Sequence, residues 1–185
     1  MFISIRELQV ERVKFDEQLG PGVLDFGPDL RQTSPLVTRG HAELVQEHRG
    51  GRLGIINDVR LVGDFSTQIE LSCARCLDPV VHDLARTFDL LYRPQGVDRR
   101  GNEVSIHEAD TEIGYYQGEG VLLEDVLREQ VLLALPLKAV CREECKGYCP
   151  HCGQNLNLQP CNCAAAVEDA RWAALKDLKK DLPRL

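Results

Sequence analysis

Eight of the 185 residues are cysteines, and their spacing favours metal coordination over disulfide formation. They come in four close pairs, which are Cys73 and Cys76, Cys141 and Cys145, Cys149 and Cys152, and Cys161 and Cys163. Two thiolates at such a spacing can bind one metal ion while the backbone N–H groups between them turn toward the sulfurs. The pattern therefore predicts a zinc protein.

The sharpest motif is Cys149-Pro-His-Cys152-Gly153, because a glycine after the second cysteine tolerates the positive φ that this turn requires. Another cysteine pair follows after a short loop. We predict a closed site, called site A, formed by Cys149, Cys152, Cys161 and Cys163. His151 could replace one of these cysteines, and the alternative is an exposed residue within the turn.

The other four cysteines predict a second site, called site B, formed by Cys73, Cys76, Cys141 and Cys145. A helix that ends near Pro136 could return the chain to the hairpin that carries Cys73. Two alternatives stay open, because Cys145 is close enough to Cys149 to share its metal and Cys73 could be a buried thiol at a strand end. We expect Zn²⁺ as the cofactor. The expected number is two ions per chain, and no fewer than one.

A thiol-redox or metal-transfer protein that uses Cys73 and Cys76 is the alternative function. Reactive C-x-x-C motifs stand at a helix N-terminus, where the dipole lowers the thiol pKa, whereas here residues 77–81 lead into another strand. The sequence shows no phosphate-binding loop, nucleophile elbow or paired-carboxylate signature. We therefore predict that the protein is not an enzyme.

Residues 36–93 have the patterns of β-strands. Apolar and polar residues alternate over 65–73, as in a half-buried strand, and a second apolar run covers 80–92. Upstream, a glycine-bearing turn separates another candidate pair, 37–48 and 52–63. Because links this short cannot make a parallel crossover, we predict an antiparallel meander.

The period changes to three and four residues after Val121, which predicts a helix over 121–135 that packs on the sheet and stops at Pro136. Residues 94–112 are polar and glycine-bearing, and we predict a surface loop. A second helix should begin at Asp169 and run to Pro183.

The predicted fold is α+β, with an antiparallel meander or partly closed sheet and one packed helix. We assign this body to residues 1–140 and a small cysteine-rich tail, with a zinc knuckle and a C-terminal helix, to 141–185. Trp172 is expected to anchor the tail helix in a core, although it could stack on a base.

Charge divides unevenly between these parts. Residues 1–140 hold 15 basic against 23 acidic residues, a net of −8, whereas 141–185 hold 7 against 6, a net of +1. Bulk charge does not favour loose binding to nucleic acid, so an RNA contact would have to be local. Candidate phosphate-binding cations are Arg142, Lys146, Lys176, Lys179 and Lys180, and the alternative is a solvated helix face.

The N-terminal residues 1–12 carry four charges and no apolar signal core, so we expect a cytoplasmic protein with reduced thiols. The longest strongly apolar stretch, 131–137, is far shorter than the roughly 20 residues that cross a bilayer. We expect no membrane span.

The order of these features resembles the YceD family, the large ribosomal RNA subunit accumulation proteins. The resemblance runs over roughly residues 30–182 and rests on the Cys73-Ala-Arg-Cys76 hairpin, the run 127–137, the cysteine-rich segment 141–163 and the motif Ala170-Arg-Trp-Ala-Ala-Leu. It implies a non-enzymatic cytosolic protein needed for 23S rRNA accumulation and large-subunit assembly, with metal and nucleic-acid binding suspected. Expected partners are rRNA, a precursor of the large subunit or a basic ribosomal protein, with no membrane and no small-molecule substrate.

Overall fold

The structure is a computed structural model that describes residues 1–49, 54–97 and 113–163. Its elements in chain order are β1 (Phe2–Ser4), α1 (Ile5–Leu8), β2 (Val13–Leu19), β3 (Arg31–Gln32), β4 (Leu36–Arg49), β5 (Gly54–Ser72), β6 (Pro79–Pro94), β7 (Ile113–Tyr116), β8 (Gly120–Leu122) and α2 (Leu123–Ala134). Strands dominate and helices are few, which confirms the α+β class.

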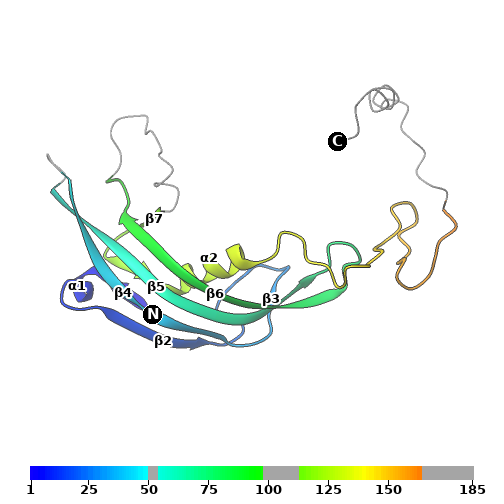
Figure 1. Cartoon of the computed structure of the whole chain (residues 1–185), viewed down its shortest axis with the longest axis horizontal. Helices are drawn as coiled ribbons and strands as arrows, with labels where there is room; N and C mark the ends of the chain where they lie inside the picture. The colour runs from blue at the N-terminus through cyan, green and yellow to red at the C-terminus, as the bar shows by residue number, and fades with distance from the viewer. Residues whose placement is uncertain (50–53, 98–112, 164–185) are drawn as a thin grey trace, which may run out of the picture.

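The main sheet has the order β2-β4-β5-β6-β7, and β3 also pairs with β5. Strands β4, β5 and β6 pair antiparallel with their neighbours in the chain, with Leu44 opposite Val59 and Leu61 opposite Leu90. A separate two-stranded sheet joins β1 to β8. Figure 1 shows long curved strands with α2 lying along the sheet.

Two sequence predictions about the sheet were wrong. The separate strands predicted over 52–63 and 65–73 are one strand, β5, of 19 residues. Strand β7, which the predicted meander over 36–93 did not include, pairs parallel with β6, because the connection between them is long enough for a crossover. The alternative of a partly closed sheet was also wrong, because the sheet is open over the described ranges, with β2 and β7 at opposite ends of the strand order.

Two facing glycines explain why β5 continues through a position that resembles a break. Gly40 of β4 lies opposite Gly63 of β5. A Cβ atom on Gly40 would lie 2.5 Å from Phe15 Cζ, and one on Gly63 would lie 3.0 Å from Phe88 Cζ. The two rings stack with centroids 6.4 Å apart. Glycine is therefore required at these strand positions to make room for aromatic rings.

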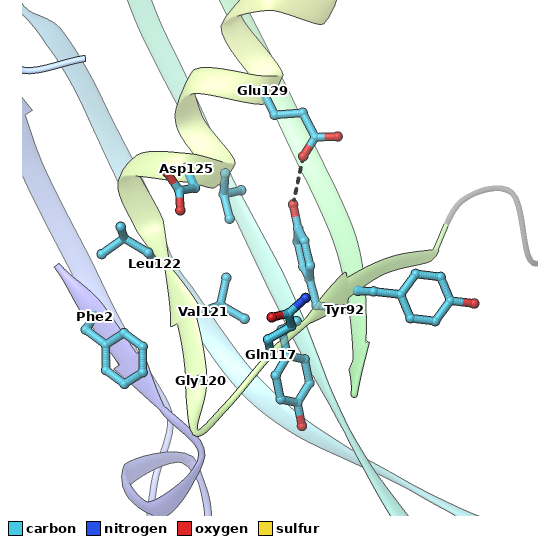
Figure 2. A pocket seen from close by; sticks show the side chains of 11 residues that line it. Phe2, Tyr92, Gln117, Gly120, Val121, Leu122, Asp125 and Glu129 are labelled. Atoms are coloured by element: carbon cyan, nitrogen blue, oxygen red, sulfur yellow. Dashed lines mark hydrogen bonds between the residues drawn. The ribbon is translucent and has the colours of Figure 1, made fainter. Parts of the chain in front are cut away.

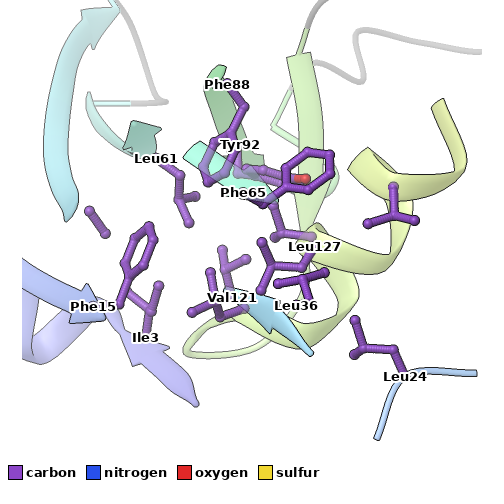
Figure 3. Close-up of a cluster of buried hydrophobic side chains, with 14 of the residues drawn as sticks. Ile3, Phe15, Leu24, Leu36, Leu61, Phe65, Phe88, Tyr92, Val121 and Leu127 are labelled. Carbon is purple, nitrogen blue, oxygen red and sulfur yellow. The ribbon is translucent and has the colours of Figure 1, made fainter. Parts of the chain in front are cut away.

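The core lies between the sheet and α2, and it also includes residues from the N-terminal segment (Figure 3). The helix contributes Leu123, Val126, Leu127 and Val131, which are at most 2% exposed. The first 30 residues, to which the sequence patterns gave no elements, supply the buried side chains of Ile3 and Phe15. This segment completes the hydrophobic face of the sheet.

The predicted helix over 121–135 begins two residues later, because residues up to Leu122 pair with β1 as strand β8. It ends at Ala134, and Leu135 is extended before Pro136, as expected for a residue that precedes proline. No helix in the described part of the chain is long and apolar enough to cross a membrane. Most of the predicted loop 94–112 and the whole predicted helix 169–183, with Trp172, lie outside the described residues.

Candidate metal centres

The structure brings the eight cysteines into two groups of four. One group is Cys73, Cys76, Cys141 and Cys145, and the other is Cys149, Cys152, Cys161 and Cys163. Within each group all sulfurs lie within 4.8 Å of one another. These are the sets proposed as site B and site A, and Cys145 lies with Cys73 rather than with Cys149.

The sulfur separations in site B match tetrahedral coordination. Cys73 Sγ lies 3.9 Å from Cys145 Sγ, and Cys76 Sγ lies 3.6 Å from Cys141 Sγ. Four thiolates at a Zn–S distance of about 2.3 Å would be separated by about 3.8 Å. A disulfide requires about 2.05 Å, so these are free thiols arranged as a four-sulfur ligand set.

Site B lies where the β5–β6 hairpin meets the segment that follows α2. Cys73 directly follows β5, and the backbone N–H of Leu77 donates to its carbonyl at 2.9 Å. The N–H of the neighbouring Ala74 donates to the carbonyl of Ala139 at 2.8 Å, which joins the hairpin to the returning chain. Cys73 and Cys76 are fully buried, and Cys145 is 3% exposed.

Polar groups around site B stabilise negative charge on two of its sulfurs. The N–H groups of Arg75 and Cys141 donate to Cys73 Sγ at 3.4 Å each, and Asn157 Nδ2 donates to Cys145 Sγ at 3.4 Å. Burial opposes ionisation of Cys73, but the surrounding N–H groups outweigh it and lower its pKa to about 6. Burial likewise opposes ionisation of Cys145, while the Asn157 amide helps to lower its pKa.

The other two sulfurs of site B do not share this stabilisation. The Asp78 N–H favours the Cys76 thiolate, yet burial and neighbouring groups raise the pKa of Cys76 above its ordinary value. Burial also raises the pKa of Cys141, and the Cys145 sulfur adds to this. Four thiolates this close repel one another, so full ionisation requires a bound cation. The donor set fits a divalent metal.

Site A has the same arrangement in a more exposed setting. The N–H of His151 donates to Cys149 Sγ at 3.4 Å. The N–H groups of Cys152 and His151 lower the Cys149 pKa to about 6, whereas the Cys152 sulfur and burial raise that of Cys163 to about 12. Cys149 is buried, while Cys152 and Cys163 are exposed. His151 lies outside the group and contributes its backbone rather than its ring.

The glycine that follows the second cysteine in the turn of site A has no counterpart in site B. Gly153, after Cys152, has φ +70°, as the sequence predicted. The equivalent residue after Cys76 is Leu77, which has φ 58° although it carries a side chain. Leu77 is also 66% exposed. A left-handed leucine gives no sequence signal, so only the cysteine spacing pointed to this turn.

Arg75 ties the hairpin to the loop that supplies Cys145. Its Nη1 donates to the carbonyls of Glu143 and Cys145 at 2.9 and 2.7 Å. Its own carbonyl accepts from the Tyr148 N–H at 3.0 Å. Gly147 has φ +71°, and a Cβ there would lie 2.6 Å from the Arg75 carbonyl oxygen. The loop can therefore close on the hairpin only with glycine at position 147.

We expect Gly147→Ala to destabilise the folded chain by about 2–4 kcal/mol, because it combines a left-handed conformation with a backbone clash. Metal content should fall toward one ion per chain as site B opens. Gly153→Ala is the matched control, since Gly153 also has positive φ but nothing lies within 4 Å of the added Cβ. Its effect should be about 1 kcal/mol. Equal effects in denaturant titrations would show that the Gly147 contact is unimportant.

The candidate RNA-binding cations are only partly described. Arg142 and Lys146 are exposed beside site B, and Glu143 and Glu144 between them are also exposed. This segment therefore carries both signs of charge. Lys176, Lys179 and Lys180 lie outside the described residues.

Comparison with known proteins finds relatives in bacteria and plants. Uncharacterized proteins of Mycobacterium tuberculosis and Mycobacterium bovis are 34% identical over 122 residues, which cover 65% of this chain and 55% of theirs. An Arabidopsis thaliana protein named large ribosomal RNA subunit accumulation protein YCED homolog 1, chloroplastic, is 25% identical over 194 residues, covering 90% of this chain and 60% of the relative. The chain thus spans about half the length of the mycobacterial relatives. No solved structure matches.

The family comparison covers the segment that contains both cysteine groups. Residues 61–179 match the family described as large ribosomal RNA subunit accumulation protein YceD. The match extends from the middle of β5 past the last cysteine, which agrees with the resemblance found in the sequence. Because it covers more than half of the chain, the protein belongs to the YceD family.

Proposed function

We propose that this protein is a non-enzymatic, zinc-binding factor that supports 23S rRNA accumulation and assembly of the large ribosomal subunit. The observation that carries the proposal is the YceD match over residues 61–179, which contains all eight cysteines. The family description supplies the link to ribosomal RNA, and the two four-sulfur groups supply the link to a metal.

Zinc suits the two groups better than other metals. Four thiolates in tetrahedral order favour Zn²⁺ or an iron–sulfur centre, and zinc needs no redox partner. A site with four protein ligands has no open position for a substrate, which is typical of structural rather than catalytic zinc. Site B would then fasten the segment after α2 to the β5–β6 hairpin, and site A would fold the segment beyond it. Reduced thiols of this kind are expected in the cytoplasm.

The partner is proposed to be rRNA, a precursor of the large subunit or a basic ribosomal protein. The net charge of −8 over residues 1–140 suits a basic protein surface. The cations of the tail would be the local contact to phosphate if RNA is bound directly. Binding of a basic protein and direct binding of RNA predict different results when the positive charges of the tail are changed to negative ones.

A thiol-redox or metal-transfer role remains the second candidate because the pKa of Cys73 is lowered to about 6. Its sulfur, however, is fully buried beside Cys145 and follows a strand rather than opening a helix. A buried thiol cannot attack a protein disulfide without local unfolding. Thiol titration of the metal-loaded protein separates the two functions, since Cys73 and Cys76 should react slowly while they bind zinc and quickly if they serve redox chemistry.

The test in cells measures the ratio of 23S to 16S rRNA after depletion and complementation. Depletion should lower the ratio, and the intact chain should restore it. The triple variant with Lys176, Lys179 and Lys180 changed to Glu keeps all eight cysteines. If the tail meets phosphate, crosslinked rRNA should fall and its salt dependence should flatten, while zinc content stays unchanged. An unchanged 23S ratio on depletion would refute the ribosomal role, and unchanged crosslinking in the variant would exclude the tail.

A further inference from the structure

A cavity of about 370 Å³ lies where β7, β8 and β1 meet the first turns of α2. Its walls combine aromatic rings with carboxylates, namely Phe2, Tyr92, Tyr115, Tyr116, Asp125 and Glu129. Figure 2 shows the Tyr92 ring between the strand and the helix, with its hydroxyl directed at Glu129. That hydroxyl donates to Glu129 Oε2 at 3.4 Å.

Two of the four aromatic residues of this cavity are exposed, while Tyr92 and Tyr116 are buried. Phe2 is 52% exposed and Tyr115 is 49% exposed, although both lie beside the hydrophobic core. The side chain of Leu122, 40% exposed, adds an apolar wall on the β8 side. Exposed rings next to carboxylates form a surface that attracts organic cations, because the ring faces carry negative charge density.

No cation of the described residues pairs with the two carboxylates of the cavity. Asp125 and Glu129 are one helical turn apart on α2, and neither forms a salt bridge within the described ranges. Burial and then the charges of Glu129 and Asp125 raise the pKa of Tyr92, which shows that their field reaches into the cavity.

Several acidic residues elsewhere on the described surface do have a cationic partner. Asp89 pairs with Arg60 at 2.6 Å, and Glu70 pairs with Arg31 at 2.7 Å. Even Glu124, the helical neighbour of Asp125, pairs with the amino group of Met1.

We propose that this cavity binds an arginine side chain of a basic protein partner. A guanidinium can stack on an aromatic face and donate in a fork to a carboxylate, and both kinds of partner line the cavity. Phosphate would be repelled by Asp125 and Glu129, which excludes nucleic acid as the occupant. The cavity lies at β7, the edge strand among the described strands, where an extended peptide can place its backbone alongside.

The cavity is distant from site B. Strand β6 runs from Pro79, beside site B, to Tyr92 in the cavity wall, which is about 40 Å at the usual rise per residue. A ligand at one end need not touch the other. The proposal therefore does not rest on the proposed ribosomal function, and either can fail without the other.

The test uses the full, metal-loaded chain and an acetylated, amidated nonapeptide with three arginines, compared with the same peptide carrying citrulline at those positions. Binding is followed by NMR shifts of the backbone amides in β7 and α2. The Asp125→Asn, Glu129→Gln variant should bind the arginine peptide about tenfold more weakly, because it loses two charge-assisted contacts but keeps the shape of the cavity.

The control for bulk charge is the Asp64→Asn, Glu17→Gln variant, which removes two carboxylates outside the cavity and should bind within about twofold of the unaltered chain. Tyr115→Leu should weaken the arginine peptide but leave the fold intact. Equal weakening in both charge variants, or equal binding of the citrulline peptide, would overturn the proposal. Displacement of the peptide by an RNA oligonucleotide from the same amides would overturn it as well.

Discussion

Cys145→Ser should reduce bound zinc from about two ions to one per chain and lower the melting temperature by about 10 °C. Cys145 supplies a sulfur 3.9 Å from that of Cys73, although 72 residues separate them in the chain. Without this ligand the segment after α2 loses its attachment to the β5–β6 hairpin. Because metal binding is coupled to folding, the loss should appear in both elemental analysis and calorimetry.

Cys161→Ser is the matched substitution in site A. It should also release one zinc ion, but the body from β2 to α2 should keep its melting transition, because site A joins only residues 149–163. Loss of both ions in either variant would mean that the two sites share ligands. Absence of metal in freshly prepared, reduced protein would refute the zinc proposal for both.

The cysteine groups were accessible to sequence reasoning because ligand spacing is local. The pairs Cys149–Cys152 and Cys161–Cys163 are short motifs. The remaining four cysteines were assigned to site B because they were the four left over. The supporting residues were not accessible. Asn157, which donates to Cys145 Sγ, and Arg75, which braces the loop, are ordinary polar residues in the sequence. Their roles depend on contacts between distant segments.

The elements of the fold could be predicted where the sequence pattern is strong. They could not be predicted where contacts between distant residues determine the structure. The helix over 121–135 has a clear period and the strand over 80–92 is an apolar run, and both were placed within two residues of their ends. The sequence predicted two strands, 52–63 and 65–73, in place of β5, because it does not reveal that the Phe88 ring occupies the space beside Gly63. The short strands β1 and β8 have too few residues for a period to show.

A buried ion network at one end of the sheet also left no sequence signal. Arg93 of β6 contacts Asp58 of β5 at 2.8 Å and Glu47 of β4 at 2.7 Å, so it crosses three strands. The side chains of Arg93 and Asp58 are only 6% and 2% exposed. Strand alternation places them on the face opposite Val59 and Tyr92, where polar residues would ordinarily meet solvent.

Arg93→Met should therefore lower the free energy of unfolding by about 3–5 kcal/mol, because it leaves the Asp58 carboxylate buried without its cation. Arg60→Met is the matched control, since Arg60 pairs with Asp89 at 2.6 Å but is 45% exposed, and it should change stability little. Adding Asp58→Asn to Arg93→Met should recover part of the loss, since a neutral amide is easier to bury. Urea titrations measure all three variants. Similar losses for Arg93→Met and Arg60→Met would show that burial does not set the strength of the Arg93 network.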